Sequence, residues 1–176
     1  MQCPSCKRGS LRPGRLEHDL PGYSCSSCSG FLLSLSPYVD WAAKQKFQAQ
    51  PQLAPFELVV RDNRAALRCP KCSRLMIKHR ISAEATHGLD YCYGCDEAWL
   101  DGGEWAWLKS KGLQASITAI STDTWQHRVR QEYGEHLREE RVKERVGEAW
   151  PEVQRVKQWL DAQPQRADIL NYLNRE

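Results

Sequence analysis

The sequence lacks the features that mark membrane and secreted proteins. No apolar run approaches the roughly 18–20 residues that a membrane-spanning helix needs. The first residues, Met1-Gln2-Cys3-Pro4, have neither the basic start nor the apolar core of a signal peptide. We therefore expect a cytoplasmic protein without a membrane partner. Its 176 residues are enough for one ordinary domain or two small ones.

Catalytic motifs are also absent from the sequence. There is no glycine-rich phosphate loop, no nucleophile elbow and no His-Glu-x-x-His pattern. The five histidines are scattered, and His127 and His136 are nine positions apart, which does not place them on adjacent helical turns. The sequence therefore predicts a protein that is not an enzyme.

Neither sign of charge dominates. Against 22 acidic residues there are 25 Lys and Arg, a formal charge of +3, which is too small to identify a nucleic-acid-binding protein. A Zn²⁺ ion held by four thiolates carries a net −2, so two such sites would change the formal charge from +3 to −1. A protein this close to neutrality exerts no long-range attraction on polyanions.

Cysteine, by contrast, is abundant and always paired. The eight cysteines form four Cys-x-x-Cys pairs with none left over: Cys3/Cys6, Cys25/Cys28, Cys69/Cys72 and Cys92/Cys95. In a reducing compartment such pairs favour metal binding over disulfides. Four thiolates from two pairs match tetrahedral zinc, in a closed shell with no position open for catalysis. We therefore predict two Zn²⁺ ions, one for each group of four cysteines.

Two alternatives to structural zinc remain open. Iron in a rubredoxin-like site has the same ligands, although such sites usually have glycine after each second cysteine, where this chain has Lys7, Ser29, Ser73 and Asp96. A redox or zinc-responsive switch would need a labile metal, and mild oxidation would then release it.

The cysteine pairs belong to an internal repeat. Cys3 and Cys69 are 66 residues apart and Cys25 and Cys92 are 67 apart, so one residue was gained or lost between the pairs. The intervening 18 and 19 residues are right for a β-hairpin in each copy. In the first copy we expect turns at Pro13-Gly14 and Pro21-Gly22; in the second, strands at 75–81 and 89–91 around a turn at His87-Gly88.

The second copy resembles the transcription-factor-IIB-type zinc ribbon found in many bacterial proteins. That family reads Cys-Pro-x-Cys, a hairpin, and then Cys-x-x-Cys-x-Gly-x-Trp-Leu-Asp-x-Gly-Glu, and residues 92–104 here read CYGCDEAWLDGGE. The chain departs from the pattern at Glu97, where the family has glycine. The first copy keeps this glycine as Gly30 but lacks the Trp-Leu-Asp-x-Gly-Glu tail. The resemblance covers about 80 of the 176 residues and implies a structural zinc site in each copy.

A helix is expected after each hairpin. Ser36 as N-cap and Pro37 at the first helical position predict a helix to about Gln48. The Asp101–Glu104 capping box predicts another helix, over 103–111, which Gly112 ends. Four residues should cover the ribbon: Trp99, Leu100, Trp105 and Leu108.

The C-terminal third reads as helix with dense charge of both signs. Asp123 and Gln126 give a capping signal, and no proline interrupts 124–149. The apolar positions shift around the helix between Leu137 and Val142, so the helix bends or ends near 138–141, or its two halves face different partners. Pro151 at a first helical position and a last helix over 166–174 complete this part.

These elements predict a small, metal-stabilised α+β protein. Its parts are a first zinc ribbon with its helix (1–50), a linker with a short strand at 56–60 (51–66), a second ribbon with its helix (67–112) and a C-terminal helical region (113–176).

We expect a non-enzymatic zinc-binding adaptor with a protein partner, in a regulatory or nucleic-acid-processing complex. Trp150 and Trp159 are candidate anchors, and the C-terminal helices offer a route to oligomerisation. The alternative is direct DNA or RNA binding as a transcription-related factor through a basic stretch whose only acid is Asp62. Its basic residues, which would otherwise balance the adjacent metal centre, are Arg61, Arg64, Arg68, Lys71, Arg74, Lys78 and Arg80.

Overall fold

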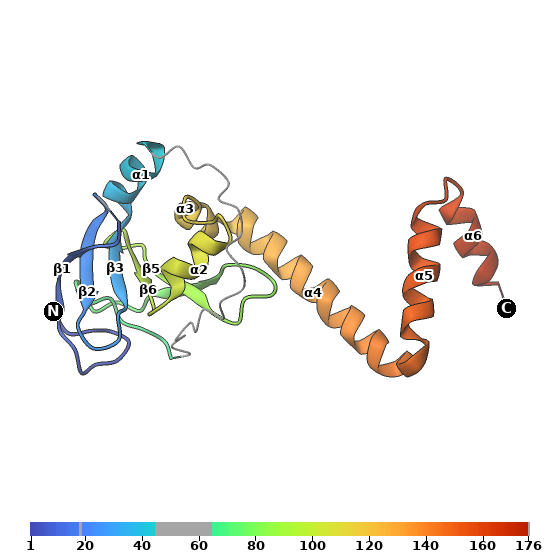
Figure 1. Ribbon diagram of the computed structural model, residues 1–176, viewed down its shortest axis with the longest axis horizontal. Helices are drawn as coiled ribbons and strands as arrows, with labels where there is room; N and C mark the ends of the chain where they lie inside the picture. The colour runs from blue at the N-terminus through green and yellow to red at the C-terminus, as the bar shows by residue number, and fades with distance from the viewer. Residues whose placement is uncertain (18, 45–64, 176) are drawn as a thin grey trace. The chain divides into compact units, whose positions relative to one another are not determined.

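The fold is built on one antiparallel sheet. The computed structural model describes residues 1–17, 19–44 and 65–175, and it confirms a small α+β protein (Figure 1). The six strands lie in the order β1-β2-β3-β6-β5-β4. Their bounds are β1 Leu11–Arg15, β2 Pro21–Cys25, β3 Phe31–Ser34, β4 Ile77–Arg80, β5 Gly88–Cys92 and β6 Glu97–Leu100.

The two sequence repeats meet at their third strands, a feature that the repeat alone did not predict. β3 pairs with β6 so that Leu32 lies opposite Trp99, with Phe31 opposite Leu100 and Leu33 opposite Ala98. Leu32 and Trp99 are equivalent positions, because the same spacing of 67 separates Cys28 from Cys95. The pairing is therefore symmetric about Leu32 and Trp99, as in a two-fold contact between identical subunits.

The first hairpin corrects the expected turns. Both Pro-Gly pairs lie inside strands, since Gly14 pairs with Gly22 and Arg15 with Pro21. The chain reverses between β1 and β2 instead, where the N–H of Leu16 donates to the carbonyl of Leu20 at 3.0 Å. Proline is tolerated here because β1 is an edge strand and Pro21 begins β2, so neither ring removes a hydrogen bond from a central position. In the second hairpin, β4 and β5 confirm the two expected strands, but the turn expected at His87-Gly88 is wrong, because Gly88 begins β5 and pairs with Arg80.

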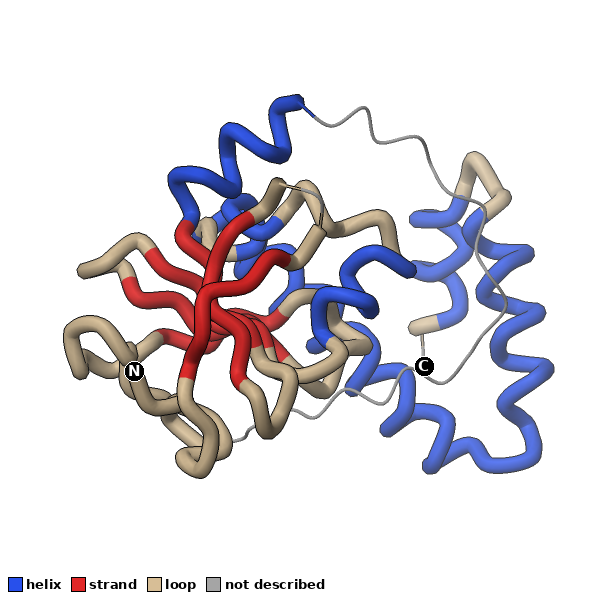
Figure 2. The backbone as a smooth tube through the Cα atoms, turned by 60° about the vertical axis from the view of Figure 1, so that its left-hand side comes forward, coloured by secondary structure: helices blue, strands red, loops and turns tan. Residues whose placement is uncertain are grey.

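Three of the helices pack on one face of the sheet (Figure 2). Phe31 and Leu33 of β3 and Leu89 and Tyr91 of β5 face α1 (Leu35–Lys44), α2 (Glu104–Ser110) and α3 (Ile117–Ile120) in one buried cluster. Leu32 and Trp99 point to the opposite face, where they are fully buried in a second cluster with cysteines of both repeats. The alternation follows from the two-residue period of a strand.

Helix α1 begins earlier than expected. It starts at Leu35, directly after β3, so Ser36 and Pro37 lie within its first turn and Ser36 is not the N-cap. The physical reason is a backbone bond between the repeats, because the N–H of Leu35 donates to the carbonyl of Asp96 at 2.9 Å. The expected end at Gln48 and the strand at 56–60 lie outside the described residues.

Helix α2 shows half of the expected capping box. The Glu104 carboxylate accepts the N–H of Asp101 at 2.7 Å, whereas the Asp101 carboxylate accepts the indole N–H of Trp99 at 2.8 Å. The end is as expected, since Gly112 adopts a left-handed conformation (φ 67°) and Leu113 donates to the carbonyl of Leu108. Trp99, Leu100, Trp105 and Leu108 are all buried.

The C-terminal helices are α4 (Asp123–Val146), the single 3-10 turn η1 (Gly147–Ala149), α5 (Trp150–Asp161) and α6 (Arg166–Leu173). Thr122 caps α4 through its hydroxyl, and Gln126 donates instead to the carbonyls of Arg80 and Ile120, which corrects the expected Asp123 capping signal. α4 is unbroken at 138–141. It ends before Gly147, which has a φ of 54°. Pro151 lies in the first turn of α5, one position after the first helical residue at which it was predicted.

The structure divides into two compact units, Met1–Glu132 and Tyr133–Glu176, with the boundary inside α4. Both repeats therefore belong to one unit. Within the described ranges, no helix combines the length and the apolar character needed to cross a membrane.

Tyr38 connects α1 to the segment around α3. Its hydroxyl donates to the carbonyl of Gln114 at 2.9 Å and accepts the N–H of Ile117 at 3.0 Å. We expect Tyr38→Phe to lower the free energy of unfolding by about 1–3 kcal/mol, because a buried backbone N–H and a partly buried carbonyl lose their partner. Chemical denaturation measures this change. Tyr172→Phe, at a position that is 76% exposed, is the matched control and should have no effect; equal stability of both variants would contradict the prediction.

Candidate metal centres

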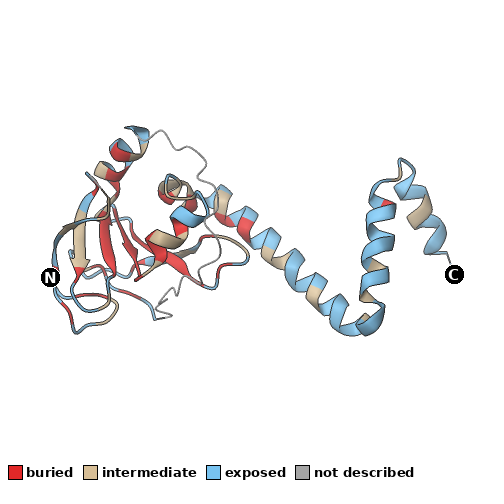
Figure 3. Ribbon diagram, viewed as in Figure 1, coloured by how far each residue is buried: buried red, intermediate tan, exposed pale blue. Residues whose placement is uncertain are grey.

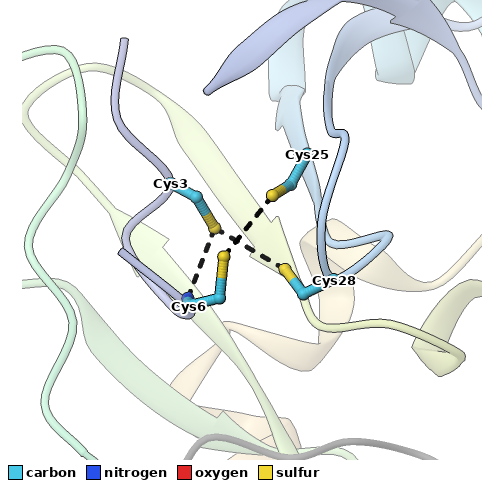
Figure 4. Close-up of side chains that lie close together, drawn as sticks. All are labelled: Cys3, Cys6, Cys25 and Cys28. Atoms are coloured by element: carbon cyan, nitrogen blue, oxygen red, sulfur yellow. Dashed lines mark hydrogen bonds between the residues drawn. The ribbon is translucent and has the colours of Figure 1, made fainter. Parts of the chain in front are cut away.

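The eight cysteines converge into two groups of four. The first centre contains Cys3, Cys6, Cys25 and Cys28, the second contains Cys69, Cys72, Cys92 and Cys95, and within each group the sulfur atoms lie within 4.8 Å of one another. All eight are free thiols. Figure 4 shows the four sulfur atoms of the first centre pointing toward one another from two separate turns. Both groupings match the cysteine sets predicted from the sequence.

The spacing of the sulfur atoms fits a tetrahedral ion. Sγ of Cys3 lies 3.6 Å from that of Cys28, and Sγ of Cys6 lies 3.6 Å from that of Cys25. In the second centre, the sulfur atoms of Cys72 and Cys92 are 3.5 Å apart. Around an ion with metal–sulfur bonds of about 2.3 Å, neighbouring sulfurs of a tetrahedron lie about 3.8 Å apart. The donor set and its spacing therefore suit a metal ion in each centre.

Each Cys-x-x-Cys pair lies in a tight turn with the same unusual backbone. The residue after every second cysteine is left-handed although it is not glycine: Lys7 (φ 54°), Ser29 (φ 59°), Ser73 (φ 61°) and Asp96 (φ 56°). In three turns its N–H donates to the carbonyl of the first cysteine, at 3.2 Å for Lys7, 3.2 Å for Ser29 and 2.8 Å for Ser73. These turns aim backbone N–H groups at the sulfur atoms, for example Ser27 N–H at Sγ of Cys25 at 3.4 Å.

The thiols of each centre differ in their tendency to ionise. The backbone N–H of Gly9 lowers the pKa of Cys6 to about 6, and that of Arg74 lowers the pKa of Cys72 to about 7. Burial raises the pKa of Cys28, and the hydrogen bond shared with Cys72 raises the pKa of Cys95 to about 12. Four thiolates at this spacing repel one another, so a cation is what allows all four to be deprotonated together.

Two lysines of the basic stretch are paired with buried carboxylates. Lys71 forms an ion pair with Glu97, whose side chain is 2% exposed and also accepts the hydroxyl of Ser34 at 2.7 Å. Lys78 Nζ lies 3.3 Å from the carboxylate of Asp90, and burial raises the pKa of Asp90 to about 7 despite this opposing charge. Part of the positive charge of the basic stretch therefore balances these buried carboxylates rather than the metal centre.

The other predicted surface residues are dispersed. The guanidinium of Arg68 donates to the carbonyl of Ser73 at 3.1 Å, and Arg74 lies against Gly94, where an added Cβ would be 2.7 Å from its Nη1. Arg80 is exposed, whereas Arg61 and Arg64 lie outside the described residues. In the C-terminal unit Trp159 is 52% exposed and Trp150 is half-buried.

Sequence reasoning missed the buried polar residues of the second repeat. Glu104 is 1% exposed and its carboxylate lies 3.2 Å from Nδ1 of His87, which is 6% exposed. The one signal in the sequence was Glu97, a charged residue where the ribbon pattern has glycine. It occupies the space beside Ser34 of the other repeat, which no local pattern reveals.

No protein-family model matches the chain, and no curated protein or solved structure matches it either. The functional argument therefore depends on the residues and geometry of the chain itself.

Ser73 tests the left-handed turns without changing a ligand. We expect Ser73→Val to weaken metal binding at the second centre about tenfold, because a branched side chain is strained at positive φ, whereas Ser73→Gly should bind at least as tightly as the natural residue. Titration with Co²⁺, followed by the visible absorption of its tetrahedral thiolate complex, measures both affinities. Equal affinity of the valine and glycine variants would contradict the assigned turn.

Proposed function

We propose that this protein is a non-enzymatic zinc-binding adaptor in the cytoplasm, in which two zinc ribbons support a surface for a protein partner. Support for zinc comes from the two groups of four thiols with tetrahedral spacing. A shell of four sulfurs leaves no position for water or substrate, so the metal would stabilise the fold rather than catalyse a reaction. The repeat of hairpin, third strand and helix supports the ribbon assignment.

The observation that carries the adaptor role is the small number of buried residues in the C-terminal unit. Among the described residues of Tyr133–Glu176, only Leu160 is buried, and Figure 3 shows exposed surface along most of these helices. The unit leaves several large apolar side chains in water: Leu137, Val142, Val156, Trp159, Tyr172 and Leu173. Helices without a packed face gain little stability by themselves, so a partner that covers these side chains would stabilise them.

Direct nucleic-acid binding has less support from the structure. Of the five described residues in the basic stretch, Lys71 and Lys78 are engaged with buried carboxylates. The two occupied metal centres would add further negative charge close to the remaining arginines.

Metal content tests the first half of the proposal. We expect two zinc ions per chain in protein purified without added metal, and at most one ion in Cys72→Ser, since a thiolate of the second centre is lost. Elemental analysis measures both values. A red protein containing iron, or a Cys72→Ser variant that keeps two ions, would contradict the zinc assignment.

Partner capture from the native host tests the second half. We expect the wild-type chain to retain a reproducible protein that the Trp159→Ser and Leu173→Ser double variant loses, because both side chains are exposed apolar anchors. Gln158→Ser, on an exposed neighbour, is the control and should retain it. If no protein depends on these side chains, and the protein binds DNA or RNA with a steep salt dependence that Arg68→Glu and Arg74→Glu abolish, the alternative function is correct.

A further inference from the structure

A residue of the second repeat supports the first metal centre. An added Cβ on Gly30 would lie 2.3 Å from Cζ2 of Trp99, so the indole lies directly against the Gly30 backbone. Gly30 contacts both ligands of its turn, because its carbonyl accepts the N–H of Cys25 at 2.8 Å and its N–H donates to the sulfur of Cys28. The backbone of Gly102 also approaches this turn, since a Cβ added to Gly102 would be 2.4 Å from the Cys28 carbonyl oxygen.

Trp99 is held rigidly in this position. Its side chain is fully buried, and its indole N–H donates to the Asp101 carboxylate at 2.8 Å. Asp101 is fixed in turn by Glu104, whose carboxylate accepts its backbone N–H. The start of α2 therefore sets the orientation of a ring that contacts the other repeat.

The first repeat supports the second centre in the same way. Leu35 donates its N–H to the carbonyl of Asp96, the left-handed residue that follows Cys95. Ser34 donates to Glu97, which also holds Lys71 of the turn between Cys69 and Cys72. Each set of turns thus depends on contacts that the other repeat supplies.

The two centres also share one buried cluster. It joins cysteines of both centres to apolar residues of both repeats, and its buried members are Cys3, Leu11, Cys25, Leu32, Leu67, Cys69, Met76, Cys92 and Trp99. Loss of order in one centre therefore exposes side chains that pack against the other.

We propose that the two metal centres load as a coupled pair, with Trp99 acting as a positioning residue for the first centre although it belongs to the second repeat. Binding of one ion orders the shared cluster and the contacts between repeats, so the second ion binds to turns that are already arranged. This inference rests on the proposed metal binding and adds to it that the sites are not independent.

Native mass spectrometry at controlled free Zn²⁺ tests the coupling. Independent equal sites would place about half of the molecules in the one-ion form at half saturation. We expect the metal-free and two-ion forms to dominate instead, with the one-ion form several-fold below the independent value. A one-ion form at or above that value overturns the coupling while leaving metal binding intact, whereas a chain that binds no metal overturns the proposed function itself.

Variants that keep all eight cysteines identify the role of Trp99. Gly30→Ala places a methyl group where the indole lies, so we expect the one-ion form to increase several-fold at half saturation. Gly134→Ala makes the same chemical change at a position with no heavy atom within 4 Å of the added Cβ, and it should keep the wild-type distribution. A wild-type distribution for Gly30→Ala overturns the role of this contact.

Trp99→Leu provides a second test if Gly30→Ala does not fold. Alkylation of cysteines during metal removal, mapped by mass spectrometry, shows which centre opens first. We expect the cysteines of the first centre to react about tenfold faster than those of the second, although the substitution lies in the second repeat. General destabilisation would open both centres together, and that result, or earlier reaction of the second centre, overturns the assignment.

Discussion

The pairing of β3 with β6 is the interaction on which the rest of the structure depends. A repeat of about 45 residues is too small to bury a sufficient core alone. Joining the third strands brings Phe31 and Leu33 beside Ala98 and Leu100 on one face of a single sheet, which three helices can cover. On the other face the same pairing places Leu32 and Trp99 in one buried cluster with cysteines of both groups.

Sequence patterns correctly predicted most features of the fold that depend on a few neighbouring residues. The Cys-x-x-Cys pairs, the hairpin of the second repeat, the end of α2 at Gly112 and the position of Pro151 each depend on a few neighbouring residues. The Pro-Gly pairs were misread as turns because their tolerance in strands depends on which strand forms the sheet edge. The sequence marked Glu97 as a departure from the ribbon pattern but could not identify its partner Ser34, which is 63 positions away.

Charge counts along the sequence also gave an incomplete view of the basic stretch, because the partners of its lysines are distant in the sequence. Lys71 and Lys78 read as surface charges among other basic residues, but each faces a carboxylate on a later strand, Glu97 or Asp90. Transferring a carboxylate from water into the protein interior is costly unless a cation pairs with it there. Part of the positive charge is therefore a consequence of the acids that the sheet buries.

The left-handed turns explain why the proposed metal ions would stabilise the fold. Lys7, Ser29, Ser73 and Asp96 each adopt a backbone that disfavours residues other than glycine, by about 1–2 kcal/mol per position. Four like-charged sulfurs in each centre add repulsion that only a cation removes. Without the ions, strain and repulsion would act on both sets of turns, and the contacts of Gly30 with Trp99 and Asp96 with Leu35 would transmit the loss of one set to the other. With the proposed ions bound, the symmetric sheet would make the two centres one folding unit.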